Sequence, residues 1–83
     1  DNTPTEMSIY PNPVGDILNI NYVFESDKPL IQIVDDTGNI LISKYYRTQN
    51  NIIEINVGNI PKGVYLINIL DNKKNFVKKF IKK

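Results

Sequence analysis

Carboxylates are the side chains of this 83-residue chain that could do chemistry, and they are poorly spaced for it. The chain has no His and no Cys, which removes the commonest general base, the thiol nucleophile and the thiolate metal ligand. Asp35 and Asp36 are adjacent at a strand end, where successive side chains point to opposite faces, so they do not suit a paired-carboxylate active site. With Asp16 they could contact a calcium ion, but Asp residues in turns more often bond their own backbone. The sequence therefore predicts no catalytic residue, no metal site and no cofactor.

Charge is distributed unevenly along the chain. Residues 1–71 carry four basic and nine acidic side chains, whereas residues 72–83 carry six Lys and no acidic residue. The acidic part would repel a phosphate backbone, so we expect no nucleic-acid partner. No apolar run approaches the roughly 20 residues of a membrane-spanning helix, so we expect no membrane insertion.

β-strands are the elements that must position these residues. Fourteen Ile and no Ala favour pleated sheets, because β-branched side chains pack well on strands and lose rotamer freedom in helices. Apolar runs and alternation between turn signals predict seven short strands, over residues 7–10, 18–22, 29–35, 40–46, 52–57, 64–70 and 76–83. This pattern predicts an all-β fold, a seven-stranded antiparallel immunoglobulin-like β-sandwich. Residues 1–6 are polar and include a Pro, so we expect the end of a linker there and the domain over 7–83.

Particular turn residues support this fold. Gly38 can take the left-handed conformation of a hairpin with a G1 bulge, and Asn50-Asn51 marks a further turn. Tyr65 follows the corner that ends at Gly63, and we interpret it as a tyrosine corner, with its ring inside and its hydroxyl bonded to upstream backbone.

The terminal segment, residues 76–83, alternates apolar pairs with lysine pairs. This repeat would segregate on a helix, but eight residues are too few for an isolated helix, so we predict a strand. One face would carry Phe76, Lys78, Phe80 and Lys82. The segment is then either an edge strand protected by lysines or a basic, apolar strand presented to a partner. Because chain ends fray, we expect deletion of residues 80–83 to leave the domain folded.

Several short motifs, in this order, resemble those of one family. A Pro-Asn-Pro element near the start is followed by Asp16–Ile20, an Asp-x-x-Gly turn, an Ile60-x-x-Gly-x-Tyr corner and a basic, apolar ending. Together they resemble the type A C-terminal sorting domain of the type IX secretion system over residues 8–83. Ile60 stands where the family has Leu, and Asn72–Asn75 stand where its last turn has Gly. The residues that carry the resemblance are Pro11, Asn12, Pro13, Asp35, Gly38, Gly63 and Tyr65, with the ending over 78–83.

The resemblance implies a sorting signal and no enzyme. Such a domain directs an attached N-terminal cargo through the type IX system across the outer membrane and is normally removed afterwards. It implies the periplasm in transit and then the cell surface or the medium as locations. The implied partners are the outer-membrane translocon, a shuttle and a sortase-like protease. Candidates for partner recognition are Lys78, Lys79, Phe80, Ile81, Lys82 and Lys83.

Two further possibilities stay open at this stage. A carbohydrate-binding or adhesion β-sandwich of a secreted or surface protein is the alternative function, with Tyr45-Tyr46 as its aromatic pair, of which one must point inward. The expected first strand, Met7–Tyr10, has an open edge and precedes a proline-stiffened hinge, so it could exchange between molecules to form a dimer.

Overall fold

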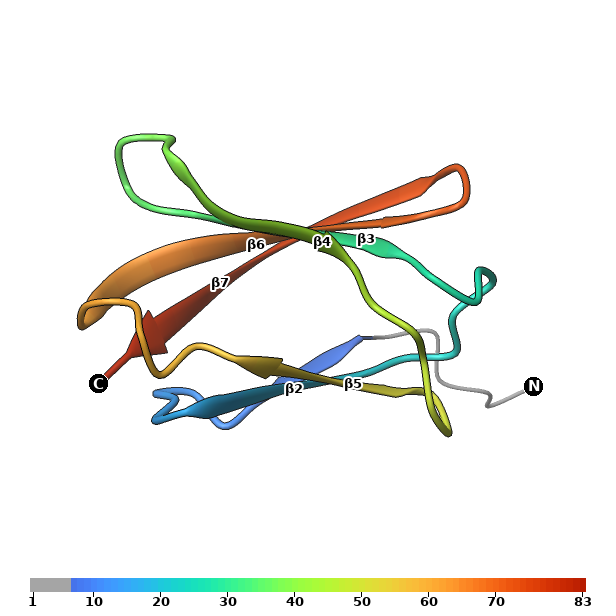
Figure 1. Cartoon of the computed structure of the whole chain (residues 1–83), viewed down its shortest axis with the longest axis horizontal. Helices are drawn as coiled ribbons and strands as arrows, with labels where there is room; N and C mark the ends of the chain where they lie inside the picture. The colour runs from blue at the N-terminus through green and yellow to red at the C-terminus, as the bar shows by residue number, and fades with distance from the viewer. Residues whose placement is uncertain (1–6) are drawn as a thin grey trace.

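Two antiparallel sheets pack face to face in the computed structural model, which describes residues 7–83 (Figure 1). The strands are β1 (Ser8–Tyr10), β2 (Ile17–Asn21), β3 (Leu30–Val34), β4 (Ile40–Tyr45), β5 (Ile52–Asn56), β6 (Gly63–Asp71) and β7 (Lys74–Lys82). One sheet has the order β1-β2-β5 and the other β4-β3-β6-β7. The predicted all-β, seven-stranded antiparallel sandwich is confirmed, and strand ends differ from the predicted ones by at most two residues. The expected linker, residues 1–6, lies outside the described residues.

The core forms because side chains alternate between the two faces of each strand. Ile31 and Ile33 of β3 and Ile67 and Ile69 of β6 are fully buried from one sheet. They face the buried side chains of the other sheet, Leu18, Ile20, Ile53 and Ile55. Aromatic pairs fill the space around this aliphatic layer, Tyr22 with Phe76 and Tyr65 with Phe80, at centroid separations of 5.0 and 5.6 Å. No helix in the described part of the chain is long and apolar enough to cross a membrane.

Tight turns use the residues expected of them. Gly38 has φ 89°, its N–H donates to the Asp35 carbonyl, and the Asp35 N–H donates to the Asn39 carbonyl, which is the predicted G1 bulge. Asn50 and Asn51 both have positive φ, 54° and 64°, as a two-residue hairpin of type I′ requires. These turns fix which residues of the adjoining strands face the core.

The predicted tyrosine corner is also present. Tyr65 is 5% exposed, and its hydroxyl donates a hydrogen bond of 2.5 Å to the Pro61 carbonyl. The ring packs in the core while the hydroxyl fixes the connection that enters β6.

A buried carboxylate holds the opposite end of the sandwich together. Asp71 is fully buried at the end of β6, and its two oxygens accept hydrogen bonds from the backbone N–H groups of Glu25 and Ser26, at 2.8 and 2.7 Å. Glu25 also forms an ion pair with Lys74, with 2.7 Å between Oε2 and Nζ. The hydrogen bond from Lys74 lowers the pKa of Glu25, and the same bond raises the pKa of Lys74. The loop between β2 and β3 is thereby tied to the β6–β7 hairpin.

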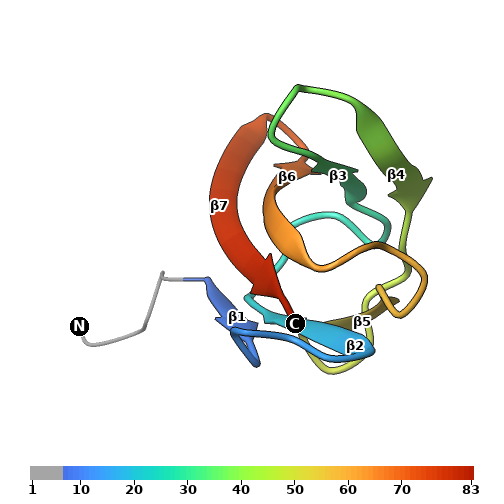
Figure 2. The same ribbon diagram turned by 90° about the vertical axis from the view of Figure 1, so that its left-hand side faces the viewer.

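The C-terminal strand joins the two sheets at one corner. Figure 2 shows β7 curving along the side of the sandwich, with its C-terminal end beside β1 and β2 of the other sheet. Val14, between β1 and β2, forms a parallel bridge with Lys82 at this corner. The start of the domain and its last residues therefore lie side by side.

Candidate recognition site on the C-terminal strand

β7 is an edge strand of its sheet and pairs with β6 along its whole length, from Lys74 opposite Asp71 to Lys82 opposite Gly63. This confirms a strand over the terminal segment. The face predicted to carry Phe76, Lys78, Phe80 and Lys82 turns inward at Phe76, which is half-buried, and at Phe80 and Lys82, which are buried. Lys78 is exposed. The outward face carries exposed side chains, Val77, Lys79 and Ile81.

The expectation that the last residues fray is wrong. Phe80 has no exposed surface and stacks on the Tyr65 ring, with 26° between the ring planes. Lys82 is only 9% exposed, and its Nζ donates to the Lys83 carbonyl at 2.9 Å. Phe80 is a core residue in the folded domain, so its side chain is not available to a partner.

The Pro-Asn-Pro element lies against the end of this strand. Asn12 Oδ1 accepts a hydrogen bond of 2.9 Å from the Ile81 N–H. The Val14 N–H donates to the Ile81 carbonyl at 2.8 Å, and the Lys83 N–H donates to the Val14 carbonyl at 3.0 Å. We call Asn12 and Val14 the clasp. The Pro-Asn-Pro element and the basic, apolar ending were identified in the sequence as two separate motifs. Nothing in the sequence pattern indicated that these segments, 69 residues apart, would be in contact.

The clasp leaves the middle of the β7 edge open. Backbone groups alternate in direction along a strand, so those of Val77 and Lys79 point away from β6, as do those of Ile81. Within residues 7–83, only the Ile81 and Lys83 groups on this side have hydrogen-bond partners. Lys78 and Lys79, both exposed, lie within this open stretch. Such an edge can accept an extended chain.

The other motif residues are distributed between this corner and a distant hairpin. Gly63 and Tyr65 lie opposite Lys82 and Phe80 in the β6–β7 ladder, so they support the end of β7. Asp35 and Gly38 form the β3–β4 hairpin, separated from β7 by β6 in the sheet order.

The Asp35 side chain stabilises that hairpin by hydrogen bonds to the residues of the turn. Its Oδ1 accepts hydrogen bonds from the N–H groups of Thr37 and Asn39, each 2.9 Å, and from the Thr37 hydroxyl. The Thr37 hydrogen bond is the main cause that lowers the Asp35 pKa, followed by the Asn39 N–H. No cluster of three His, Cys, Asp or Glu side chains in residues 7–83 is placed to hold a metal ion.

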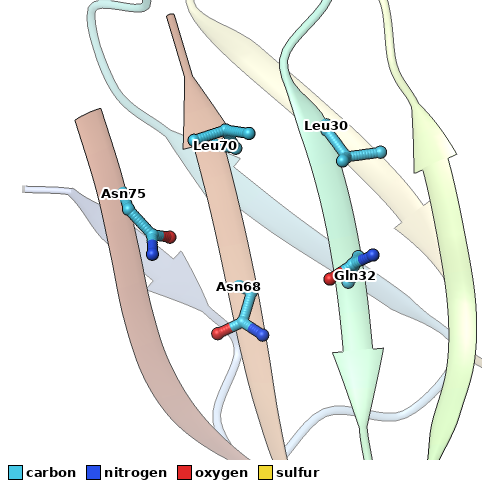
Figure 3. A pocket seen from close by; sticks show the side chains of 5 residues that line it. All are labelled: Leu30, Gln32, Asn68, Leu70 and Asn75. Carbon is cyan, nitrogen blue, oxygen red and sulfur yellow. The ribbon is translucent and has the colours of Figure 1, made fainter. Parts of the chain in front are cut away.

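A hollow of about 190 Å³ lies on the outer face of the larger sheet (Figure 3). It is lined by amides and leucines, Leu30, Gln32, Asn68, Leu70 and Asn75, and it contains no titratable or nucleophilic group. Tyr45 is 66% exposed, while Tyr46 packs against the core, so one ring of this pair points inward as predicted. The pair therefore offers a single exposed ring and no aromatic platform.

The sequence matches the secretion system C-terminal sorting domain family over residues 8–83, nearly the whole chain. No curated protein matches it. Domains of this family are the C-terminal sorting signals of type IX secretion, and the family is not an enzymatic one. Its partners are the type IX secretion machinery and an N-terminal cargo, and its destination is the cell surface or the extracellular space. The chain belongs to the C-terminal sorting domain family of the type IX secretion system.

Proposed function

We propose that the secretion machinery recognises this domain through β7 and that the domain itself performs no chemistry. The observation that carries the proposal is the open backbone edge at Val77 and Lys79, together with the exposed side chains of Lys78 and Lys79. Lys78, Lys79, Ile81 and Lys83 make up the proposed surface, and the buried Phe80 and Lys82 are excluded from it.

Strand addition is the proposed mode of contact. An extended segment of a receptor pairs with the outward N–H and C=O groups of β7, which gives affinity that depends little on side chains. The exposed ammonium groups of Lys78 and Lys79 favour acidic residues in that segment and raise the encounter rate. The outer-membrane translocon and the shuttle are the receptors that would meet this edge.

The remaining steps of export follow from the role of a sorting signal attached to a cargo. The cargo lies N-terminal to the domain, and residues 1–6 are the end of the linker that joins them. The domain passes through the periplasm with its cargo and then through the outer membrane. A sortase-like protease removes it, and the cargo stays at the cell surface or enters the medium.

Export of a fused reporter tests the proposal. Residues 1–83, placed behind a signal peptide and a reporter in a strain with the type IX system, should carry the reporter to the surface or the medium. Reversing Lys78 and Lys79 to Glu should slow export, more so at low salt, because like charges then oppose the encounter. The control reverses Lys28 and Lys44, both exposed and outside β7, and changes the net charge equally.

Two results would overturn parts of the proposal. Retention of the wild-type fusion in the periplasm, equal to a reporter without the domain, would reject export through this domain. Equal export rates for the two double reversals would show that the charge around the β7 edge is not recognised.

A further inference from the structure

The clasp holds the end of β7 where the β6 ladder stops. The last pair in that ladder is Lys82 with Gly63, and glycine offers no side chain to cover the strand end. Chain ends open with free energies close to zero unless other groups hold them. Here the outward groups of Ile81 and Lys83 are held by Asn12 and Val14.

We propose that Asn12 is a positioning residue, which fixes Ile81–Lys83 in the strand conformation that the secretion machinery reads. This inference rests on the proposed recognition of β7. Asn12 is itself exposed, and the hydrogen bond from Ile81 is what its side chain contributes among the described residues. The flanking Pro11 and Pro13 have restricted φ, so less conformational entropy is lost when the Asn12 amide is placed.

The same contact brings the first and the last of the family motifs together on one surface. Pro11, Asn12 and Pro13 are exposed beside Ile81, which is 42% exposed, and the exposed Lys83. A Cβ added to Gly15 would lie 3.8 Å from Lys83 Cε, so the lysine stem extends over this segment. A receptor that binds the end of β7 therefore meets the segment next to β1 as well.

Three variants separate positioning from ordinary stabilisation. Asn12→Ala removes the acceptor, whereas Asn12→Asp keeps an oxygen at the same place. Asn56→Ala is the matched control, since Asn56 Oδ1 accepts a bond of 2.8 Å from the Gly58 N–H in the exposed turn that follows β5 and makes no hydrogen bond to β7. Each variant is measured for the melting temperature of the domain, amide exchange at Ile81 and export of the reporter, well below all melting temperatures.

One hydrogen bond of this kind changes an equilibrium roughly two- to tenfold. Asn12→Ala should therefore speed exchange at Ile81 by roughly that factor. Because a receptor binds only the ordered fraction, export should fall by up to the same factor. Asn12→Asp should exchange at Ile81 like the wild type and export better than Asn12→Ala. Asn56→Ala should lose similar stability and export normally.

The outcomes distinguish this inference from the proposal beneath it. Equal export by Asn12→Ala and Asn56→Ala, with faster exchange at Ile81 in the former, would overturn the positioning role and leave recognition of β7 intact. Unchanged exchange at Ile81 would show that the clasp does not order the strand end. A wild-type fusion that is not exported would reject the proposed function, and the positioning role with it.

Discussion

The Tyr65 hydroxyl connects the core to the corner before β6 through one hydrogen bond. The ring is buried against Phe80, whereas the acceptor belongs to the exposed Pro61. Water can therefore replace the hydroxyl at the Pro61 carbonyl once the hydroxyl is removed. The contribution of this bond should be that of an ordinary hydrogen bond, without the added cost of a buried unpaired carbonyl.

Tyr65→Phe should lower the free energy of unfolding by about 0.5 to 1.5 kcal/mol, because the ring still packs and only the hydrogen bond is lost. Urea unfolding followed by circular dichroism measures this difference. Tyr45→Phe makes the same chemical change on an exposed ring and should leave the unfolding midpoint unchanged. Equal midpoints for both variants would contradict the role given to the Tyr65 hydroxyl.

Asp71 shows what residue patterns cannot reveal. In the sequence it is a polar residue that begins a turn, and such residues are usually solvated. Its burial depends on the N–H groups of Glu25 and Ser26, which are 46 and 45 residues away and carry no signal in their side chains. Tyr65 was predictable because its ring, its corner and its acceptor lie within five residues of sequence.

Alternation of apolar residues along each strand was enough to predict the elements and their inward faces. Val77 and Ile81 were predicted on the other face of the strand from Phe80 and Lys82. This prediction needs no knowledge of the neighbouring strand, because side chains alternate along any strand. The stability of the strand end was not predictable in this way. It depends on stacking with Tyr65 and on the clasp, which are contacts between elements.

Deletion of residues 80–83 should therefore unfold the domain. Loss of a buried Phe costs about 3 to 5 kcal/mol, which is most of the stability of a small domain. Deletion of Lys83 alone removes an exposed side chain and one clasp bond, and this variant should still melt cooperatively. Circular dichroism and thermal melting of both truncations test this.

A cooperative melt of the longer truncation near the wild-type temperature would show that Phe80 contributes little. If the longer truncation unfolds as expected, truncation cannot separate recognition of β7 from folding of the domain. Lost export after removal of residues 80–83 would report unfolding, so recognition has to be tested with point substitutions on the exposed face of β7.

The charge asymmetry of the chain becomes a charged edge in the folded molecule. Lys73 and Lys74 lie at one end of β7 and Lys82 and Lys83 at the other. A strand rises roughly 3.4 Å per residue, so the lysines extend over most of the long dimension of the molecule, 39 Å. Lys74 is paired with Glu25, which leaves the excess positive charge toward the middle and the C-terminal end. The sequence predicted the excess of lysine, but its distribution along an open edge depends on the sheet order.

We propose that β1 can exchange between two molecules, which would re-form identical contacts in a dimer. β1 contributes three residues and, among residues 7–83, pairs with no strand other than β2, so few contacts must break. The clasp opposes exchange, because it holds Asn12, two residues after β1, to Ile81 of the same chain. Light scattering over a rising concentration series should show a dimer whose share grows with concentration and is larger for Asn12→Ala than for Asn56→Ala. Monomers alone for all of these proteins at the highest concentration would rule out exchange, and equal dimer shares for the two variants would show that the clasp does not restrain β1.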